Sequence, residues 1–168
     1  MSVLDEIEAA IPRLRRAARA LTRDAAAADD LVQDSLERAL ARRRHWRGDG
    51  PVAGWIWKIM LNIHRDGARR AAPHLVVVDE LPQVPAAGDA AEDRLALAEV
   101  RAAIARLPVD QRQVLVLVAL EGQTLQAAAA ILGIPEGTLV SRLGRARAAL
   151  RSMTGRDPRT PLQKKDSR

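Results

Sequence analysis

Cysteine, phenylalanine and tyrosine are absent from this 168-residue sequence, whose only aromatic residues are Trp46, Trp55 and Trp57. Without cysteine the chain forms neither disulfides nor thiolate metal sites, and it suits a reducing compartment. The longest strongly apolar run, VLVLVAL at 114–120, is far shorter than the roughly 20 residues of a membrane span. The N-terminus, MSVLDEIEAAIPRLRR, carries charges and lacks a signal-peptide core. We therefore expect a cytoplasmic protein with no membrane insertion.

Patterns typical of β-strands are nearly absent as well. Only Leu75–Val78 has the apolar, β-branched character of a strand, and it lies among prolines. Apolar residues elsewhere recur at helical spacing, which predicts an all-α fold. The predicted helices cover about 7–21, 24–45, 52–70, 91–107, 109–120, 125–132 and 135–152. Pro12 lies inside the first of these patterns and is expected to kink or split that helix.

The periodicity also places apolar side chains at defined positions of the predicted helices. The second helix carries Leu31, Val32, Leu36, Ala39 and Leu40 on one side. In the third helix we expect the core residues to be Trp55, Ile56, Ile59, Met60 and Ile63, while the position of Trp57 stays open. The helix at 91–107 has Leu95, Val100 and Ile104 among its apolar positions. Asp24 and Thr124 are predicted N-caps, because their side chains can accept from free backbone amides.

Charge divides the chain into three parts. Residues 1–72 carry a net +4, residues 73–99 carry −5 and residues 100–168 carry +7. Pro73, Pro82 and Pro85 interrupt the acidic part, which predicts a flexible linker at 73–91. Two small helical domains are then expected at 1–72 and 92–153, followed by a disordered tail at 154–168. Basic modules of this kind favour polyanionic partners such as nucleic acid.

The stretch LGIPEGTLVSRLGRARAAL at 132–150 predicts the second helix of a helix-turn-helix. A glycine turn at Gly133 and Pro135 introduce this helix, whose core stripe is Leu139, Leu143, Ala146 and Leu150. Its far side presents Thr138, Ser141, Arg142 and Arg145. Arginine can hold phosphate or read guanine edges, and serine can bond either group. The alternative is a basic helix face that is exposed to solvent and binds no ligand. The capped preceding helix and the local positive charge disfavour this alternative.

These residues resemble a known family. LPVDQRQVLVLVALEGQTLQAAAAILGIPEGTLVSRLGRARAAL at 107–150 is similar to the C-terminal DNA-binding domain of extracytoplasmic-function (ECF) sigma factors, the small sigma-70-type initiation factors of bacteria. DDLVQDSLERALARRRHW at 29–46 resembles the polymerase-binding helix of that family. GWIWKIMLNIHRDGARR at 54–70 resembles its promoter −10 helix. The resemblance implies an ECF sigma factor that directs core RNA polymerase to promoters.

The resemblance assigns a task to each predicted surface. The −35 promoter element would contact Thr138, Ser141, Arg142, Arg145 and Arg147. The −10 element would contact Trp46, Lys58, Asn62, Arg65, Asp66, Arg69 and Arg70, with Trp46 available for base stacking. Core polymerase, through a basic coiled coil, would contact Asp30, Gln33, Asp34 and Glu37, which share one helix side. The alternative for this acidic side is a solvated face with Asp34 paired to Arg38. An anti-sigma protein is a further expected partner.

The sequence departs from the family pattern just after Thr124. The family usually has an aromatic residue, Glu and Ile-Ala there, where this chain has Leu125-Gln126-Ala127-Ala128-Ala129. Ala127 removes a capping-box carboxylate, a loss of about 1 kcal/mol or less, and Ala128 underfills a core position. Two other functions therefore stay open: a helix-turn-helix regulator that acts without polymerase, and a sigma-like adaptor that does not initiate. The sequence predicts no catalytic site, metal site or cofactor, because the three histidines lack ligand-rich surroundings.

Overall fold

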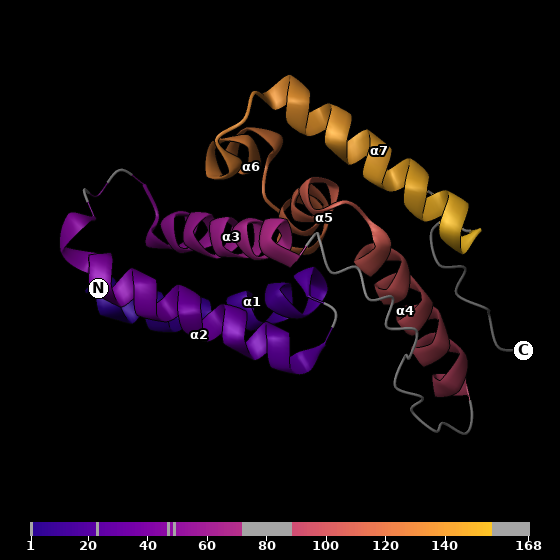
Figure 1. Ribbon diagram of the computed structural model, residues 1–168, viewed down its shortest axis with the longest axis horizontal. Coiled ribbons are helices and arrows are strands. Elements are labelled where there is room, and N and C mark those ends of the chain that lie inside the picture. The colour runs from indigo at the N-terminus through magenta and orange to yellow at the C-terminus, as the bar shows by residue number, and fades with distance from the viewer. Residues whose placement is uncertain (1, 23, 47, 49, 72–88, 156–168) are drawn as a thin grey trace, which may run out of the picture.

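Helices are the regular secondary structure of the described part of the chain. The computed structural model describes residues 2–22, 24–46, 48, 50–71 and 89–155, with side chains in the last range from residue 95 onward. No strand occurs within these ranges, which confirms the predicted all-α fold class. We call residues 2–71 the N-terminal half and residues 89–155 the C-terminal half (Figure 1). The predicted strand-like stretch, most of the predicted linker and nearly all of the predicted tail lie outside the described residues.

The first two helices begin at side-chain caps. Ser2 and Asp5 form a reciprocal capping box at the start of α1 (Val3–Leu21). Asp24 caps α2 (Ala25–Arg42) as predicted, because its Oδ1 accepts from the Ala27 amide at 2.7 Å. Such caps satisfy amides that have no partner within the helix. α1 continues through Pro12, so the predicted alternative of a split helix was wrong. Pro12 lies on the exposed side, while the buried side holds the helix in place.

The buried face of α2 is narrower than the pattern predicted. Leu31, Val32 and Ala39 are buried, but Leu40, which the pattern places on the same side, is 39% exposed. The reason is that Leu40 lies at the edge of the face that packs on α1, where it lines a shallow groove. A short 3-10 turn, η1 (Arg43–His45), ends this helix.

Helix α3 (Val52–Ala71) packs on both halves of the molecule. Ile56 and Ile59 are buried as predicted. The prediction for Trp55 was wrong, because this side chain is only partly buried and lies against Trp46, whereas Trp57 is 2% exposed. α3 contacts α1 and α2 on one side and the C-terminal half on another. More of its circumference is therefore buried than a three-helix bundle alone would cover, which places Trp57 in the core.

Helix α4 (Asp89–Arg106) begins inside the predicted linker. Its buried contacts lie near its end, where Ala103 is buried and Ile104 is partly buried. Leu95, one of the apolar positions of the predicted helix, is 63% exposed, and Leu97 is 56% exposed. Only the C-terminal end of α4 is buried against the rest of the described structure. The spacing of apolar residues in a sequence predicts a helix, but it does not reveal how much of that helix is buried.

The remaining helices form a compact helix-turn-helix unit. α5 (Val109–Leu115) continues into η2 (Val116–Leu120), a wider π-helical turn in which the Glu121 amide donates to the Val116 carbonyl. α6 (Leu125–Leu132) and α7 (Glu136–Thr154) follow. Pro135 is the N-cap of α7 and not a residue of its first turn, one position earlier than predicted.

One hydrophobic core joins the two halves. Buried residues of α1, α2 and α3 form a single cluster with buried residues of α5, η2, α6 and α7. Figure 1 shows α5 in the middle of the molecule, with α3 between the first two helices and α6. The structure therefore presents the two predicted helical units packed together in a closed arrangement, which the sequence did not reveal.

Candidate nucleic-acid interface

The turn of the helix-turn-helix is built from a cap and a glycine. Thr124 Oγ1 accepts from the Ala127 amide at 3.1 Å, which confirms the predicted cap of α6. Gly133 has a φ of 65°, a left-handed conformation that glycine adopts without strain, and it ends α6. The Ile134 amide donates back to the Ala129 carbonyl at 3.1 Å. This turn directs α7 away from α6 at a defined angle.

The predicted core stripe of α7 is confirmed. Leu139 and Ala146 are fully buried, Leu143 is 4% exposed and Leu150 is partly buried. Ala128 is also fully buried, within the single core of the molecule. The burial of this stripe fixes which side of α7 faces outward.

The outward side of α7 carries the residues predicted to bind the −35 element. Ser141, Arg145 and Arg147 are exposed, and Thr138 is partly buried. Arg142 differs, because its Nη2 lies 3.1 Å from Oδ2 of Asp110 on α5 and its side chain is only 29% exposed. The structure therefore offers Ser141 and Arg145 directly to a ligand, while Arg142 is held by a carboxylate of the same half.

The residues predicted to bind the −10 element spread along α3. Arg65 Nη2 donates to Asn62 Oδ1 at 2.9 Å, and both side chains are partly buried. Arg65 Nε is buried without a hydrogen-bond partner. Lys58 and Arg69 are exposed and Asp66 is partly buried. The exposed Arg70 donates from Nε to the Asp66 carbonyl at 3.3 Å.

Trp46 lies beside this helix at the start of the loop at 47–51. Its ring centroid is 5.3 Å from that of Trp55, with the planes tilted by 35°. Such tilted aromatic pairs are favourable at this distance. Gly48 and Gly50 have φ values of 76° and 113°, conformations that glycine adopts without strain. Trp55 therefore holds Trp46 where α3 begins.

The predicted acidic face of α2 is exposed. Asp30, Gln33, Asp34 and Glu37 all face outward, and Gln33 Nε2 donates to Glu37 Oε1 at 3.0 Å. Within the described residues Asp34 and Arg38 make no ion pair, so the pairing alternative is not found. A shallow groove lies beside this face between α1 and α2, lined by Arg15, Arg19, Asp29, Val32, Gln33, Leu36, Glu37 and Leu40.

A polar network between the halves was missed by the sequence reasoning. Arg112 Nη1 donates to the Leu21 carbonyl at 2.6 Å, and other nitrogens of Arg112 bind carbonyls at the end of α4. Gln113 Nε2 donates to the Leu61 carbonyl at 2.8 Å and lies 3.1 Å from His64 Nδ1. The available signal was the position of Arg112 and Gln113 directly before the apolar run at 114–120.

His64 completes that network as a neutral side chain. Its Nε2 lies 3.1 Å from the Leu21 carbonyl, so Nε2 carries the proton and Nδ1 accepts from Gln113. Burial, and to a smaller extent the nearby positive charge of Arg112, lower the pKa of His64 from 6.5 to about 4. The described residues contain no cluster of potential metal ligands. Nor does any helix among them have the length and apolarity to cross a membrane.

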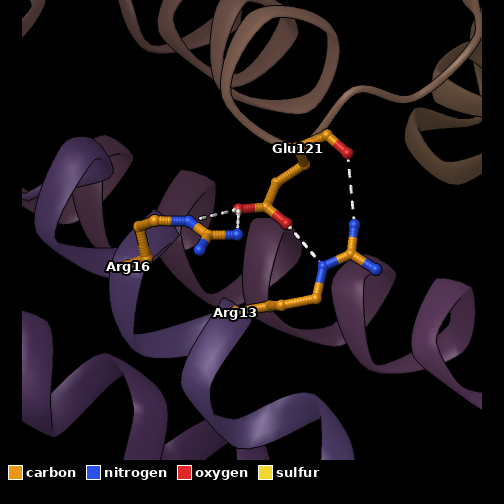
Figure 2. A network of polar contacts seen from close by, with 3 residues as sticks. All are labelled: Arg13, Arg16 and Glu121. Carbon is orange, nitrogen blue, oxygen red and sulfur yellow. Dashed lines mark hydrogen bonds and ion pairs between the residues drawn. The ribbon is translucent and has the colours of Figure 1, made fainter.

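A second polar contact joins the halves at Glu121. This residue follows η2, and its side chain is 0% exposed. Arg13 Nε of α1 lies 2.9 Å from Oε2 of Glu121, and Arg16 Nη2 lies 3.3 Å from Oε1 (Figure 2). Arg13 Nη2 also donates to the Glu121 carbonyl at 3.1 Å. The two arginines therefore supply the partners that a buried carboxylate needs.

Two family models match the two halves. Residues 7–61 match the family described as the Sigma2 domain of PhyR, and residues 97–150 match region 4 of sigma-70. The first range includes α2 with the candidate polymerase residues and ends within α3 before Asn62, and the second includes the helix-turn-helix.

The similarity extends over most of the chain in individual relatives. The ECF RNA polymerase sigma factor EcfG of Rhodopseudomonas palustris is 38% identical, covering 90% of this chain and 84% of that protein. The ECF RNA polymerase sigma factor SigM of Mycobacterium tuberculosis is 37% identical, covering 85% of this chain and 72% of that protein. The sigma factor RpoE of Bartonella quintana, solved with the anti-sigma factor NepR, superposes with a TM-score of 0.72. It is 28% identical, covering 91% of this chain and 96% of that one. The chain belongs to the extracytoplasmic-function group of sigma-70-type RNA polymerase sigma factors.

Proposed function

We propose that this ECF sigma factor divides its work between its two halves. Residues 1–72 would act as the region 2-like domain that binds core polymerase and the −10 element. Residues 92–153 would act as the region 4-like domain that binds the −35 element, with 73–91 as the linker. The supporting observation is the outward side of α7, where Ser141 and Arg145 are exposed behind a left-handed glycine turn.

The −35 contacts follow from the chemistry of that side. Arg145 can bond a guanine edge with two donors, and Ser141 can bond a base or a phosphate. Arg147 is a phosphate contact, which adds affinity without sequence preference. Thr138 lies nearer the N-terminus of α7, whose backbone dipole favours a phosphate. Arg142 would contact DNA only after its ion pair with Asp110 breaks.

The −10 contacts would be made by α3 and the loop before it. Asn62 can bond the edge of an unpaired base, and the Arg65 bond to its Oδ1 sets the orientation of the amide. Lys58, Arg69 and Arg70 would hold the phosphates of the separated strand, with Asp66 holding Arg70 through its backbone carbonyl. Trp46 would stack on a base, at about 1–3 kcal/mol per base.

Core polymerase would dock on α2. Asp30, Asp34 and Glu37 present carboxylates to water without ion-pair partners among the described side chains, which suits a basic surface. The partly buried Leu36 and the exposed Leu40 border this face and offer apolar area beside the charges. Charge would then guide association, while the apolar border would add affinity.

An anti-sigma protein is proposed as the regulatory partner. RpoE of Bartonella quintana was solved with the anti-sigma factor NepR. CnrH, which is 30% identical with a TM-score of 0.62 and covers 84% of this chain, was solved with the cytosolic domain of CnrY. We propose that this chain acts in the cytoplasm, has no catalytic activity of its own and uses no cofactor.

Run-off transcription with purified core polymerase tests the proposed function. The template would be a pooled library of upstream fragments from the source genome. Discrete starts that vanish without the protein, and that share −35 and −10 sequences, are expected. Binding to duplex DNA without any starts would instead indicate a regulator that acts without polymerase. Failure in both assays would indicate an adaptor.

A further inference from the structure

An apolar side chain lies exposed on α7, next to the residues proposed to bind the −35 element. Val140 is 48% exposed and directly precedes the exposed Ser141. α4, α5 and α6 contact α7, which lies at the outside of the molecule (Figure 1). The buried stripe of Leu139 and Leu143 makes these contacts, and Val140 belongs to no buried cluster of the described residues. Its methyl groups are therefore accessible to a ligand.

Two helical neighbours of Val140 have no side chain. Gly137 precedes it by three residues and Gly144 follows it by four, the spacings at which side chains of a helix meet. A Cβ at either glycine would meet no atom within 4 Å, and neither glycine has a positive φ. Neither packing nor backbone conformation among the described residues therefore requires glycine at these positions. The bare backbone on both sides of Val140 allows another surface to approach its methyl groups closely.

The chemistry of valine limits what Val140 can recognise. Its side chain neither donates nor accepts a hydrogen bond, so it can only select an apolar group. A β-branched side chain in a helix has one strongly preferred rotamer, so a contact costs it little conformational freedom. In the major groove of DNA, the apolar group on the base edges is the methyl group of thymine. An exposed valine on a helix that enters this groove is therefore suited to contact thymine.

We propose that Val140 determines part of the −35 sequence by contacting the methyl group of one thymine. The inference rests on the −35 role proposed above for α7, and it adds an apolar contact to the polar ones of Ser141 and Arg145. Hydrogen bonds to the base edge do not distinguish thymine from uracil, because the two bases differ only in the methyl group. A contact with Val140 does distinguish them, and this difference can be measured.

Replacement of thymine by uracil tests the contact in the complete holoenzyme. The promoter is one obtained by run-off transcription, and each thymine of its −35 element, on either strand, is replaced in turn. Competition binding measures the affinity of the full chain bound to core polymerase. We expect uracil at one position to weaken binding about threefold, the size expected for one buried methyl group. If uracil had no effect at any position, the proposal would be overturned.

Val140→Ala tests whether this residue makes the contact. Val140 is exposed and alanine is the better helix former, so the fold should persist. The variant should bind the thymine promoter about threefold more weakly than the wild type and should bind the uracil promoter equally well. Leu95→Ala shortens an exposed apolar side chain on α4 and should keep the wild-type response to uracil. A full uracil effect in Val140→Ala would show that another residue reads the methyl group.

A methylated cytosine tests the contact by gain of affinity. Cytosine in place of the sensitive thymine removes the methyl group, and 5-methylcytosine returns a methyl group to the same place in the groove. The wild type should bind the methylated promoter about threefold more tightly than the unmethylated one, whereas Val140→Ala should not distinguish them. An equal gain in both proteins would contradict the proposal.

The same experiments separate this inference from the function on which it rests. Discrete transcription starts combined with uracil-insensitive binding would refute the role of Val140 alone and leave the sigma-factor function standing. Failure of the wild-type protein to initiate at any promoter would refute the proposed function, and the inference with it.

Discussion

Arg142 on α7 and Asp110 on α5 form an ion pair of 3.1 Å at the edge of the helix-turn-helix. The pair is partly exposed, with 29% of the Arg142 side chain and 48% of the Asp110 side chain accessible, so its contribution to folding is small. In the proposed −35 contact, Arg142 would have to leave this carboxylate before it could hold a phosphate. We therefore expect Asp110 to limit attachment of this arginine to DNA of any sequence.

Asp110→Asn should increase binding to non-promoter DNA. The freed arginine adds about one phosphate contact, so the slope of log affinity against log salt should steepen by about 0.9. Titration of a labelled random duplex at several salt concentrations measures both quantities. Glu136→Gln removes an equal charge from an exposed site on α7 and is the control. If both variants changed affinity equally, the effect would come from net charge and not from release of Arg142.

Arg145→Ala and Arg147→Ala should weaken promoter binding in different ways. Loss of a base contact at Arg145 should cost about 1–3 kcal/mol on the preferred −35 sequence and relax the preference at one position. Loss of a phosphate contact at Arg147 should weaken all sequences similarly and lower the salt slope by about 1. Binding to a panel of single-base −35 variants separates the two patterns. A uniform loss for Arg145→Ala would contradict its role in base recognition.

Asp34→Lys should impair binding of core polymerase while leaving the fold intact. The residue is exposed on α2, so the change removes no buried contact. A reversed charge on a surface that meets a basic partner should lower affinity at least about tenfold, with a strong salt dependence. Fluorescence titration of labelled protein with core polymerase measures this. Glu8→Lys makes the same change on α1, and an equal loss for both variants would argue against a docking site on α2.

The helices could be predicted from the sequence because their signals are local. Asp24 and Thr124 are caps whose partners lie three residues away, and Leu139 belongs to a stripe set by helical spacing. Once this buried stripe is known, the residues on the opposite side of α7 are predicted to be exposed. Proposed contacts with bases, phosphates and polymerase came from the family resemblance, and their individual roles stay predictions.

The contacts between the halves could not be predicted, because they join residues that are far apart in the sequence. Glu121 is 108 residues from Arg13 in the sequence, so no periodicity links them. Trp57, whose position the sequence left open, is buried and Trp55 is only partly buried, because α3 packs on both halves. Leu95 lies outside the packed end of α4, which a pattern of apolar residues cannot reveal.

Asn62→Ala should weaken recognition of the −10 element at one base. The amide is partly buried and bonded to Arg65, so its removal also frees the Arg65 guanidinium. Arg65 can then still hold a phosphate, and the loss should be confined to sequence preference at about 1–3 kcal/mol. Abortive transcription on templates with single-base −10 changes measures the preference. The −35 preference serves as the internal control, and its loss in the same variant would indicate misfolding.

His64→Gln should flatten the acid side of the stability profile. The pKa of His64 is lowered to about 4 in the folded protein, against about 6.5 when unfolded, so the unfolded state binds more protons between these values. The neutral form thus stabilises the fold above pH 6.5, and this stability is lost as the pH falls toward 4. Between pH 7.5 and pH 5 the wild type should lose about 2 kcal/mol that the variant keeps. Urea unfolding at both pH values measures the difference. His45→Gln, at an exposed histidine, should leave the wild-type slope unchanged, and an identical slope for all three proteins would show that His64 is not buried in solution.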